Sequence, residues 1–169
     1  MITDRPLIKI RRARPADADA LAAVFAACWR NAYTGVIPYM HLDQMIRARD
    51  DTWWENAIKR EGDILVLDVS GTVAGYATFG RSRHRTKHQG EIYELYLAPV
   101  YQGIGLGEHL FEACRQSLDT QNLNGLIVWA LADNQAACDF YWRRGGRAVA
   151  EVKEQFGPSK LSKIGFGWT

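Results

Sequence analysis

Three glycines occupy alternate positions in the stretch QGIGLG, residues 102–107, between an apolar strand-like run and a segment with helical spacing. The N-terminus of a helix exposes unpaired backbone N–H groups and a partial positive charge, which suit a phosphate when no side chain blocks the approach. Gly103, Gly105 and Gly107 remove such side chains. A tight turn that needs glycine only for its backbone is the alternative. The stretch therefore predicts either an anion-binding turn or a purely structural one.

Two common phosphate motifs do not fit this turn. A dinucleotide-binding fingerprint needs a glycine three residues after Gly105, where the chain has Glu108. The GxxxxGK pattern of a P-loop does not occur in the sequence. The surroundings favour a different ligand, because a strand-like run leads directly into the turn and a second strand–helix unit follows it.

Two carboxylates precede the turn in the run EIYELYL, residues 91–97. Side chains alternate between the faces of a strand, so Glu91 should share a face with Tyr93 and Leu95. Glu94 should lie on the other face, unless a bulge shifts the register. Each carboxylate can act as a base or simply be solvated at the end of a strand, and both interpretations stay open.

The segment RSRHRTKHQ, residues 81–89, is strongly basic and contains Arg81, Arg83, Arg85 and Lys87. A short basic run is stable in water without a partner, so a solvated loop and a binding patch are both compatible with it. The net charge of the chain is only +2, which is too small to indicate a nucleic-acid or membrane partner.

The spacing of apolar residues predicts a mixed sheet with helices packed on it. Strands are expected at residues 7–13, 63–69, 72–80, 91–97, 125–131, 147–156 and 160–168. Helices are expected at residues 16–32, 42–60, 105–118 and 134–144. Asp50 and Asp51 are a candidate break within the second of these helices.

The length of 169 residues, with 47% hydrophobic and 24% charged residues, predicts a single globular domain over residues 1–169. Cys28, Cys114 and Cys138 show no CxxC spacing, so reduced thiols and no metal site are expected. The first residues lack the apolar core of a signal peptide, and no segment approaches the roughly 18 apolar residues of a membrane span. A cytoplasmic protein without a membrane partner is therefore expected.

Two spaced motifs resemble those of the GNAT superfamily of acyl-CoA N-acetyltransferases. The pyrophosphate loop of that family has the pattern Q/R-x-x-G-x-G/A, which is matched in register by Gln102, Gly105 and Gly107. A later pattern combines an asparagine, a helix with Phe-Tyr, and basic residues before a glycine. It is matched by Asn134, Phe140, Tyr141, Arg143, Arg144 and Gly145. The opening segment IKIRRARPADADALAAVF also looks like the family's first strand and helix, so the resemblance covers nearly the whole chain.

The resemblance implies an α/β fold with a mixed, mostly antiparallel sheet of about seven strands, about four helices, and a splay between strands four and five. A bulge that breaks their pairing lets the pantetheine arm of acetyl-CoA, the cosubstrate, pair with the open strand. The N–H of Leu95 would face the acetyl carbonyl, Leu97 would bind pantetheine amides, and the glycine turn would bind the pyrophosphate. The implied cofactor-binding residues are Leu95, Tyr96, Leu97, Gln102, Gly103, Ile104, Gly105, Leu106, Gly107, Asn134 and Tyr141.

The chemistry of the family implies direct attack of a neutral amine on the thioester. An alkyl ammonium has a pKa of about 10, so a proton acceptor is needed. Glu91, Glu94 or a water chain is the candidate base, and Glu91 is preferred because histone-type members carry a base glutamate there. Tyr141, at the family's tyrosine position, would protonate the departing thiolate. Packing between Phe140 and Trp142 is its alternative role.

The implied acceptor is an amine of a small molecule or a peptide, and its identity is not readable from the sequence. The candidate acceptor-binding residues are Trp29, Tyr33, Tyr39, Arg83 and Arg85. Both arginines would attract a carboxylate-bearing acceptor, unless one reaches the 3′-phosphate of the cofactor or the loop is only solvated. A non-catalytic CoA-binding sensor and a nucleic-acid-binding module that uses residues 81–87 are the alternative functions. The near-neutral charge disfavours nucleic acid, and homodimerisation stays open.

Overall fold

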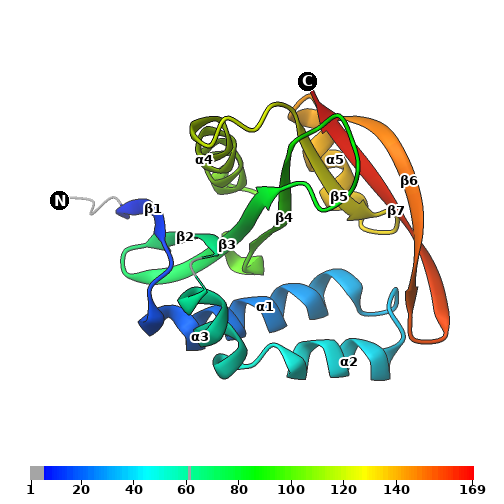
Figure 1. Ribbon diagram of the computed structural model, residues 1–169. Coiled ribbons are helices and arrows are strands. Elements are labelled where there is room, and N and C mark those ends of the chain that lie inside the picture. Colours follow the sequence, from blue (N-terminus) through cyan, green and yellow to red (C-terminus); the bar gives the residue numbers. More distant parts are fainter. Residues whose placement is uncertain (1–5, 61) are drawn as a thin grey trace.

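The computed structural model describes residues 6–60 and 62–169 and is built around one seven-stranded sheet (Figure 1). The strands are β1 (Ile8–Arg12), β2 (Asp63–Val69), β3 (Thr72–Arg81), β4 (Gly90–Leu97), β5 (Leu126–Leu131), β6 (Arg147–Phe156) and β7 (Ser159–Trp168). The helices are α1 (Ala18–Tyr33), α2 (Tyr39–Ala48), α3 (Asp51–Lys59), α4 (Leu106–Thr120) and α5 (Gln135–Arg143). Short 3₁₀ turns precede α1 (Pro15–Asp17) and follow β4 (Pro99–Tyr101).

The sheet has the strand order β1-β2-β3-β4-β5-β7-β6. Every neighbouring pair is antiparallel except β4 and β5, which run parallel and pair only from Gly90 to Ile92 against Leu126 to Val128. Beyond these residues the two strands diverge, which splits the sheet into two wings (Figure 1). The predicted seven-stranded mixed sheet with a splay between strands four and five is confirmed.

Helices cover the two faces of the sheet with separate apolar cores. On one face α4 and α5 pack around buried residues that include Phe111 and Tyr141. On the other face α1, α2 and α3 pack around Phe25, Trp54 and Tyr76 (Figure 1). Every side chain of β4 therefore meets one of two different environments, depending on the face to which it points.

The helical stretch expected at residues 42–60 is divided at the candidate break. The side chain of Asp50 accepts a hydrogen bond from the N–H of Trp53 at 2.9 Å and so caps the start of α3. Such a cap satisfies one of the N–H groups that a helix start leaves unpaired. The described residues consequently form five α-helices instead of about four, and none of them is long and apolar enough to cross a membrane.

A bulge in β4 corrects the expectation that Glu91 and Glu94 lie on opposite faces. Thr78 of β3 pairs with Glu94 while Phe79 pairs with Ile92, so Tyr93 is an extra residue in β4. Gly80 pairs with Glu91, and Gly80 and Thr78 are two positions apart on one strand. Directly opposed residues share a face of the sheet, so both glutamates lie on the same face.

Replacing Asp50, the cap of α3, should measurably lower the stability of the protein. Asp50→Ala should lower the free energy of unfolding by about 1 kcal/mol, because the start of the helix loses its side-chain acceptor. Asp50→Asn keeps an acceptor and should remain within a few tenths of a kcal/mol of wild type. Urea titrations followed by circular dichroism compare the three proteins. Equal stabilities of the alanine and asparagine variants would contradict the capping role.

Candidate active site

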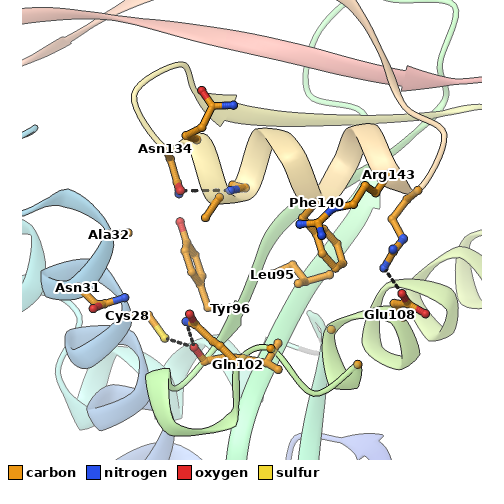
Figure 2. Close-up of a pocket in the computed structure, with 18 of the residues that line it drawn as sticks. Cys28, Asn31, Ala32, Leu95, Tyr96, Gln102, Glu108, Asn134, Phe140 and Arg143 are labelled. Carbon is orange, nitrogen blue, oxygen red and sulfur yellow. Dashed lines mark hydrogen bonds and ion pairs between the residues drawn. The ribbon is translucent and has the colours of Figure 1, made fainter.

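A pocket of about 620 Å³ lies where β4 leaves β5 (Figure 2). Its walls come from the second half of α1, the end of β4, the glycine turn with the start of α4, and α5 with the preceding loop. The predicted cofactor residues that line it are Leu95, Tyr96, Leu97, Gln102, Gly103, Gly105, Gly107 and Asn134. Ile104, which is 68% exposed on the turn, and the buried residues Leu106 and Tyr141 are not among the lining residues.

The pocket exposes a backbone edge of β4 that has no strand partner. The N–H of Ala98 donates to the carbonyl of Ala74 on β3, and backbone direction alternates along a strand. The N–H and C=O groups of Leu95 and Leu97 therefore point away from β3, into the gap left by β5. The carbonyl of Leu97 instead accepts from the side chains of Gln102, at 2.9 Å, and Cys28, at 3.1 Å. Gln102 thus ties the glycine turn to the open edge.

The three glycines of the turn serve two different needs. Gly103 and Gly105 have φ of 80° and 84°, in the left-handed region that favours glycine, and Gly105 is the N-cap of α4. A Cβ atom on either would meet no atom within 4 Å, so the space beside the turn is open. A Cβ atom on Gly107 would lie 3.1 Å from the ring of Phe140. The first two glycines leave room for a ligand, and the third allows α4 and α5 to approach closely.

Helix α5 supplies cationic side chains to the pocket. Arg143 and Arg144 both line it. The guanidinium of Arg144 pairs with Glu108 at 2.7 Å and lies 4.9 Å from the centre of the Phe140 ring. Both arginines belong to the second sequence motif, but they are not among the cofactor-binding residues predicted from the sequence. The sequence feature that indicates their place in the site is the helical spacing of Asn134, Ala137, Phe140 and Arg144. This spacing turns one face of α5 toward the pocket.

Tyr141 and Asn134 hold the two ends of α5 in different ways. The side chain of Asn134 accepts from the N–H of Ala137 at 3.2 Å and caps the helix. Tyr141 is 6% exposed and packs against Phe166 and Trp168. Burial raises the pKa of its phenol above the usual value, so the hydroxyl group stays protonated at neutral pH. Its ring is therefore part of the core under α5, with a neutral hydroxyl group.

Glu91 is fully buried and is bound by the basic loop between β3 and β4. Its carboxylate accepts from the N–H of Arg83 at 3.1 Å and from the Arg83 guanidinium at 2.7 and 3.2 Å. The guanidinium also lies 4.3 Å from the centre of the Tyr93 ring. Glu91 does not line the pocket. In this structure its contacts anchor the loop.

Glu94 belongs to a polar network beneath α1 and α3. Its carboxylate accepts two hydrogen bonds from Arg49, at 2.7 and 3.0 Å, and one from the hydroxyl of Tyr76 at 2.8 Å. The Arg49 guanidinium also stacks on Trp53, 4.1 Å from the ring centre. Glu94 does not line the pocket either. Within residues 6–60 and 62–169, no three His, Cys, Asp or Glu side chains are grouped to hold a metal ion.

The five predicted acceptor-binding residues are not brought together at the pocket. Trp29 and Tyr33 pack in the core under α1, where the Tyr33 hydroxyl lies 2.8 Å from that of Tyr96. Tyr39 is 79% exposed at the start of α2. Arg83 is engaged by Glu91, and Arg85 is exposed on the same loop. Tyr33 and Trp29 therefore border the pocket only indirectly, through Tyr96, whose ring lies 6.2 Å from that of Trp29.

The amino-acid sequence of this chain is similar to those of known N-acetyltransferases. A sequence model described as the Acetyltransferase (GNAT) family matches residues 21–146, more than half of the chain. The chain is 27% identical over 164 residues to the uncharacterized N-acetyltransferase YuaI of Bacillus subtilis (strain 168), covering 96% of this chain and 93% of YuaI. It is also 27% identical over 157 residues to the L-amino acid N-acyltransferase MnaT of Escherichia coli (strain K12), covering 87% of this chain and 84% of MnaT.

A solved structure shows the same fold. The PaiA N-acetyltransferase from Thermoplasma acidophilum, in complex with coenzyme A, superposes with a TM-score of 0.75 at 19% sequence identity. The match covers 94% of this chain and 98% of that one. The family match spans the open edge of β4, the glycine turn and α5, all of which contribute to the pocket. The chain belongs to the acetyltransferase (GNAT) family.

Proposed function

We propose that this chain transfers the acetyl group of acetyl-CoA directly to an amine of a small molecule or a peptide. Membership of the GNAT family makes it an acyl-CoA-dependent N-acetyltransferase with acetyl-CoA as cosubstrate. The observation that carries the finer proposal is the unpaired edge of β4, which leads directly to the glycine turn. An arm containing amides can add to such an edge as a strand would, and a phosphate suits the helix start.

The pocket residues suggest how the cosubstrate is held. The pyrophosphate would bind the N–H groups of residues 102–107, with Arg143 and Arg144 as neighbouring cations. The pantetheine amides would pair with the backbone of Leu95 and Leu97. The N–H of Leu95 would then donate to the acetyl carbonyl, whose oxygen gains negative charge when the amine attacks.

Two proton transfers complete the reaction. The departing thiolate needs a proton, and we propose Tyr141 as its donor from its place in the family motif. Burial raises the pKa of its phenol, so the hydroxyl group holds its proton at neutral pH. Tyr141 does not itself line the pocket, but it lies on α5, from which Ala137 and Phe140 do. The attacking ammonium must lose a proton before it can react. The carboxylates of Glu91 and Glu94 are each bound by an arginine, and neither lines the pocket. These contacts support a water chain as the route for this proton, in preference to either glutamate.

Amino acids are the first class of acceptor amine to be tested. The name of MnaT, an L-amino acid N-acyltransferase, puts L-amino acids first among amines to be tested. The expectation that the basic loop attracts a carboxylate now rests mainly on Arg85, because the Arg83 charge is neutralised by Glu91. Release of CoA from acetyl-CoA should be measured with amino acids, polyamines, aminoglycosides and peptide N-termini. Binding of acetyl-CoA without transfer to any of them would favour a CoA-binding sensor instead.

The glycine turn provides the first prediction about binding. Gly105→Glu should weaken acetyl-CoA binding by roughly 100-fold or more, because a carboxylate would occupy the open space assigned to the pyrophosphate. Gly71→Glu is a matched control, since Gly71 has φ of 88° and is equally open but lies in the β2–β3 turn. Calorimetry measures both. Unchanged affinity in a folded Gly105→Glu protein would refute the assignment of the turn.

The second prediction concerns the phenol of Tyr141. Tyr141→Phe should lower kcat by roughly 100-fold and leave the Kd of acetyl-CoA nearly unchanged, because only the proton donor is lost. The raised pKa also means that wild-type activity should show no alkaline decline from this group up to about pH 10. Kinetics across pH with an active amine test both points. Turnover close to wild type would return Tyr141 to a packing role.

The third prediction is that the two members of the Arg83–Glu91 pair, which anchors the basic loop, contribute unequally to stability. Arg83→Ala should lower the free energy of unfolding by about 3–5 kcal/mol, because the fully buried carboxylate of Glu91 loses the guanidinium and keeps only the backbone N–H of residue 83. Glu91→Gln should cost only about 1–2 kcal/mol, since the Arg83 side chain is 57% exposed and can be hydrated. Arg85→Ala, on the same loop, serves as the control and should stay within about 0.5 kcal/mol. Denaturant titrations that reverse the first two values would contradict this account.

A further inference from the structure

On the side of the pocket that faces α1, Tyr96 lines it beside Cys28, Asn31 and Ala32, and Tyr33 supports Tyr96 through a hydroxyl–hydroxyl hydrogen bond. Tyr96 lies between Leu95 and Leu97 on β4 and lines the pocket. Its hydroxyl oxygen is 2.8 Å from that of Tyr33, which ends α1. Figure 2 shows the Tyr96 ring extending from β4 toward Asn134, at the start of α5. The ring therefore points from β4 toward the start of α5 on this side of the pocket.

Neighbouring aromatic rings hold this pair in place. Tyr33 is 6% exposed, and the ring of Trp29 meets it edge-on with 4.9 Å between centroids. Trp29 and Tyr76 also flank the ring of Tyr96, at 6.2 and 6.0 Å. Protein interiors are close-packed, so one ring can move only if its neighbours move as well. The Tyr33–Tyr96 wall is therefore a fixed boundary of the pocket.

The position of this wall relative to the acyl-CoA donor rests on the proposed function. In that proposal the acyl carbonyl binds the N–H of Leu95, one residue before Tyr96. The side chain of Leu95 packs toward α4 and α5, whereas Tyr96 packs with the core under α1. The body of the cosubstrate would occupy the α4–α5 side, because its phosphates lie at the glycine turn. The free end of the acyl group then points to the opposite side, at the Tyr33–Tyr96 wall.

We propose that the Tyr33–Tyr96 wall limits the acyl group of the donor to about the size of acetyl. Each added methylene would press against rings that have no room to yield, and overpacking of a close-packed site is unfavourable. One methylene in such a site changes kcat/KM by roughly 10–200-fold. Tyr96 is thus a specificity-determining residue, and Tyr33 is a positioning residue that fixes the Tyr96 ring.

A series of donors tests the wall before any acceptor is known. Release of CoA from acetyl-, propionyl-, butyryl- and hexanoyl-CoA can be followed with water as acceptor, and the Kd of each thioester can be measured by calorimetry. Wild type should prefer acetyl-CoA over butyryl-CoA by roughly 10-fold or more in kcat/KM. Tyr96→Ala removes the ring and should use butyryl- and hexanoyl-CoA about as well as acetyl-CoA.

Two variants separate the ring from its hydrogen bond. Tyr96→Phe keeps the ring and loses only the hydroxyl group, so it should retain a preference for acetyl-CoA. Tyr33→Phe removes the same hydrogen bond from the other side, so both variants should narrow the preference for acetyl-CoA without abolishing it. This partial change in donor ratio is a readout that a loss of stability alone would not produce. Tyr96→Leu replaces the alanine variant in the series if the latter does not fold.

The outcomes distinguish this inference from the function on which it rests. Two results would overturn the proposed role of the wall while acetyl-CoA still binds. One is equal kcat/KM for acetyl- and hexanoyl-CoA in wild type. The other is a ratio of these kcat/KM values that stays unchanged in folded Tyr96→Ala or Tyr96→Leu. Failure of wild type to bind any of the four thioesters would overturn the proposed function itself. Loss of the acetyl preference in the alanine or leucine variant, with its retention in Tyr96→Phe, is the result that supports the wall.

Discussion

The early end of pairing between β4 and β5 is the constraint on which the rest of this structure depends. Backbone N–H and C=O groups inside a protein need partners, and a parallel pair normally supplies them along its whole length. Here pairing stops at Ile92 and Val128, so the groups of Leu95 and Leu97 face a gap. Cys28 and Gln102 satisfy one of the carbonyls with side chains. The remaining edge is what a cosubstrate rich in amides can use.

The two apolar cores place different groups on the two sides of this gap. The apolar core under α4 and α5 brings the glycine turn and the arginines of α5 to one side of the open edge. The core under α1–α3 contains Tyr33 and Tyr96, whose hydroxyl groups bond to each other, and on the same side of the sheet Arg49 binds Glu94. One side of β4 is thereby suited to a charged, extended molecule. The other side carries the Tyr33–Tyr96 pair.

The sequence alone predicted the order of helices and strands along the chain, the glycine turn and the family resemblance, because these depend on local patterns and on two motifs at fixed positions. It did not predict that Glu91 and Glu94 share a face, since a single extra residue at Tyr93 reverses the alternation and leaves no trace in composition. It also could not reveal that Arg49, which is 45 residues away, binds Glu94. Contacts of this kind are decided by how whole elements pack.

Backbone hydrogen exchange tests the central claim, that the open edge of β4 pairs with the cosubstrate. In the free protein the amides of Leu95 and Leu97 should exchange faster than that of Tyr96, which faces β3. Acetyl-CoA should slow exchange at Leu95 and Leu97 and in the glycine turn. 3′-Phosphoadenosine 5′-diphosphate, which lacks the pantetheine arm, should protect the turn alone. Unchanged exchange at Leu95 and Leu97 in saturating acetyl-CoA would contradict the account.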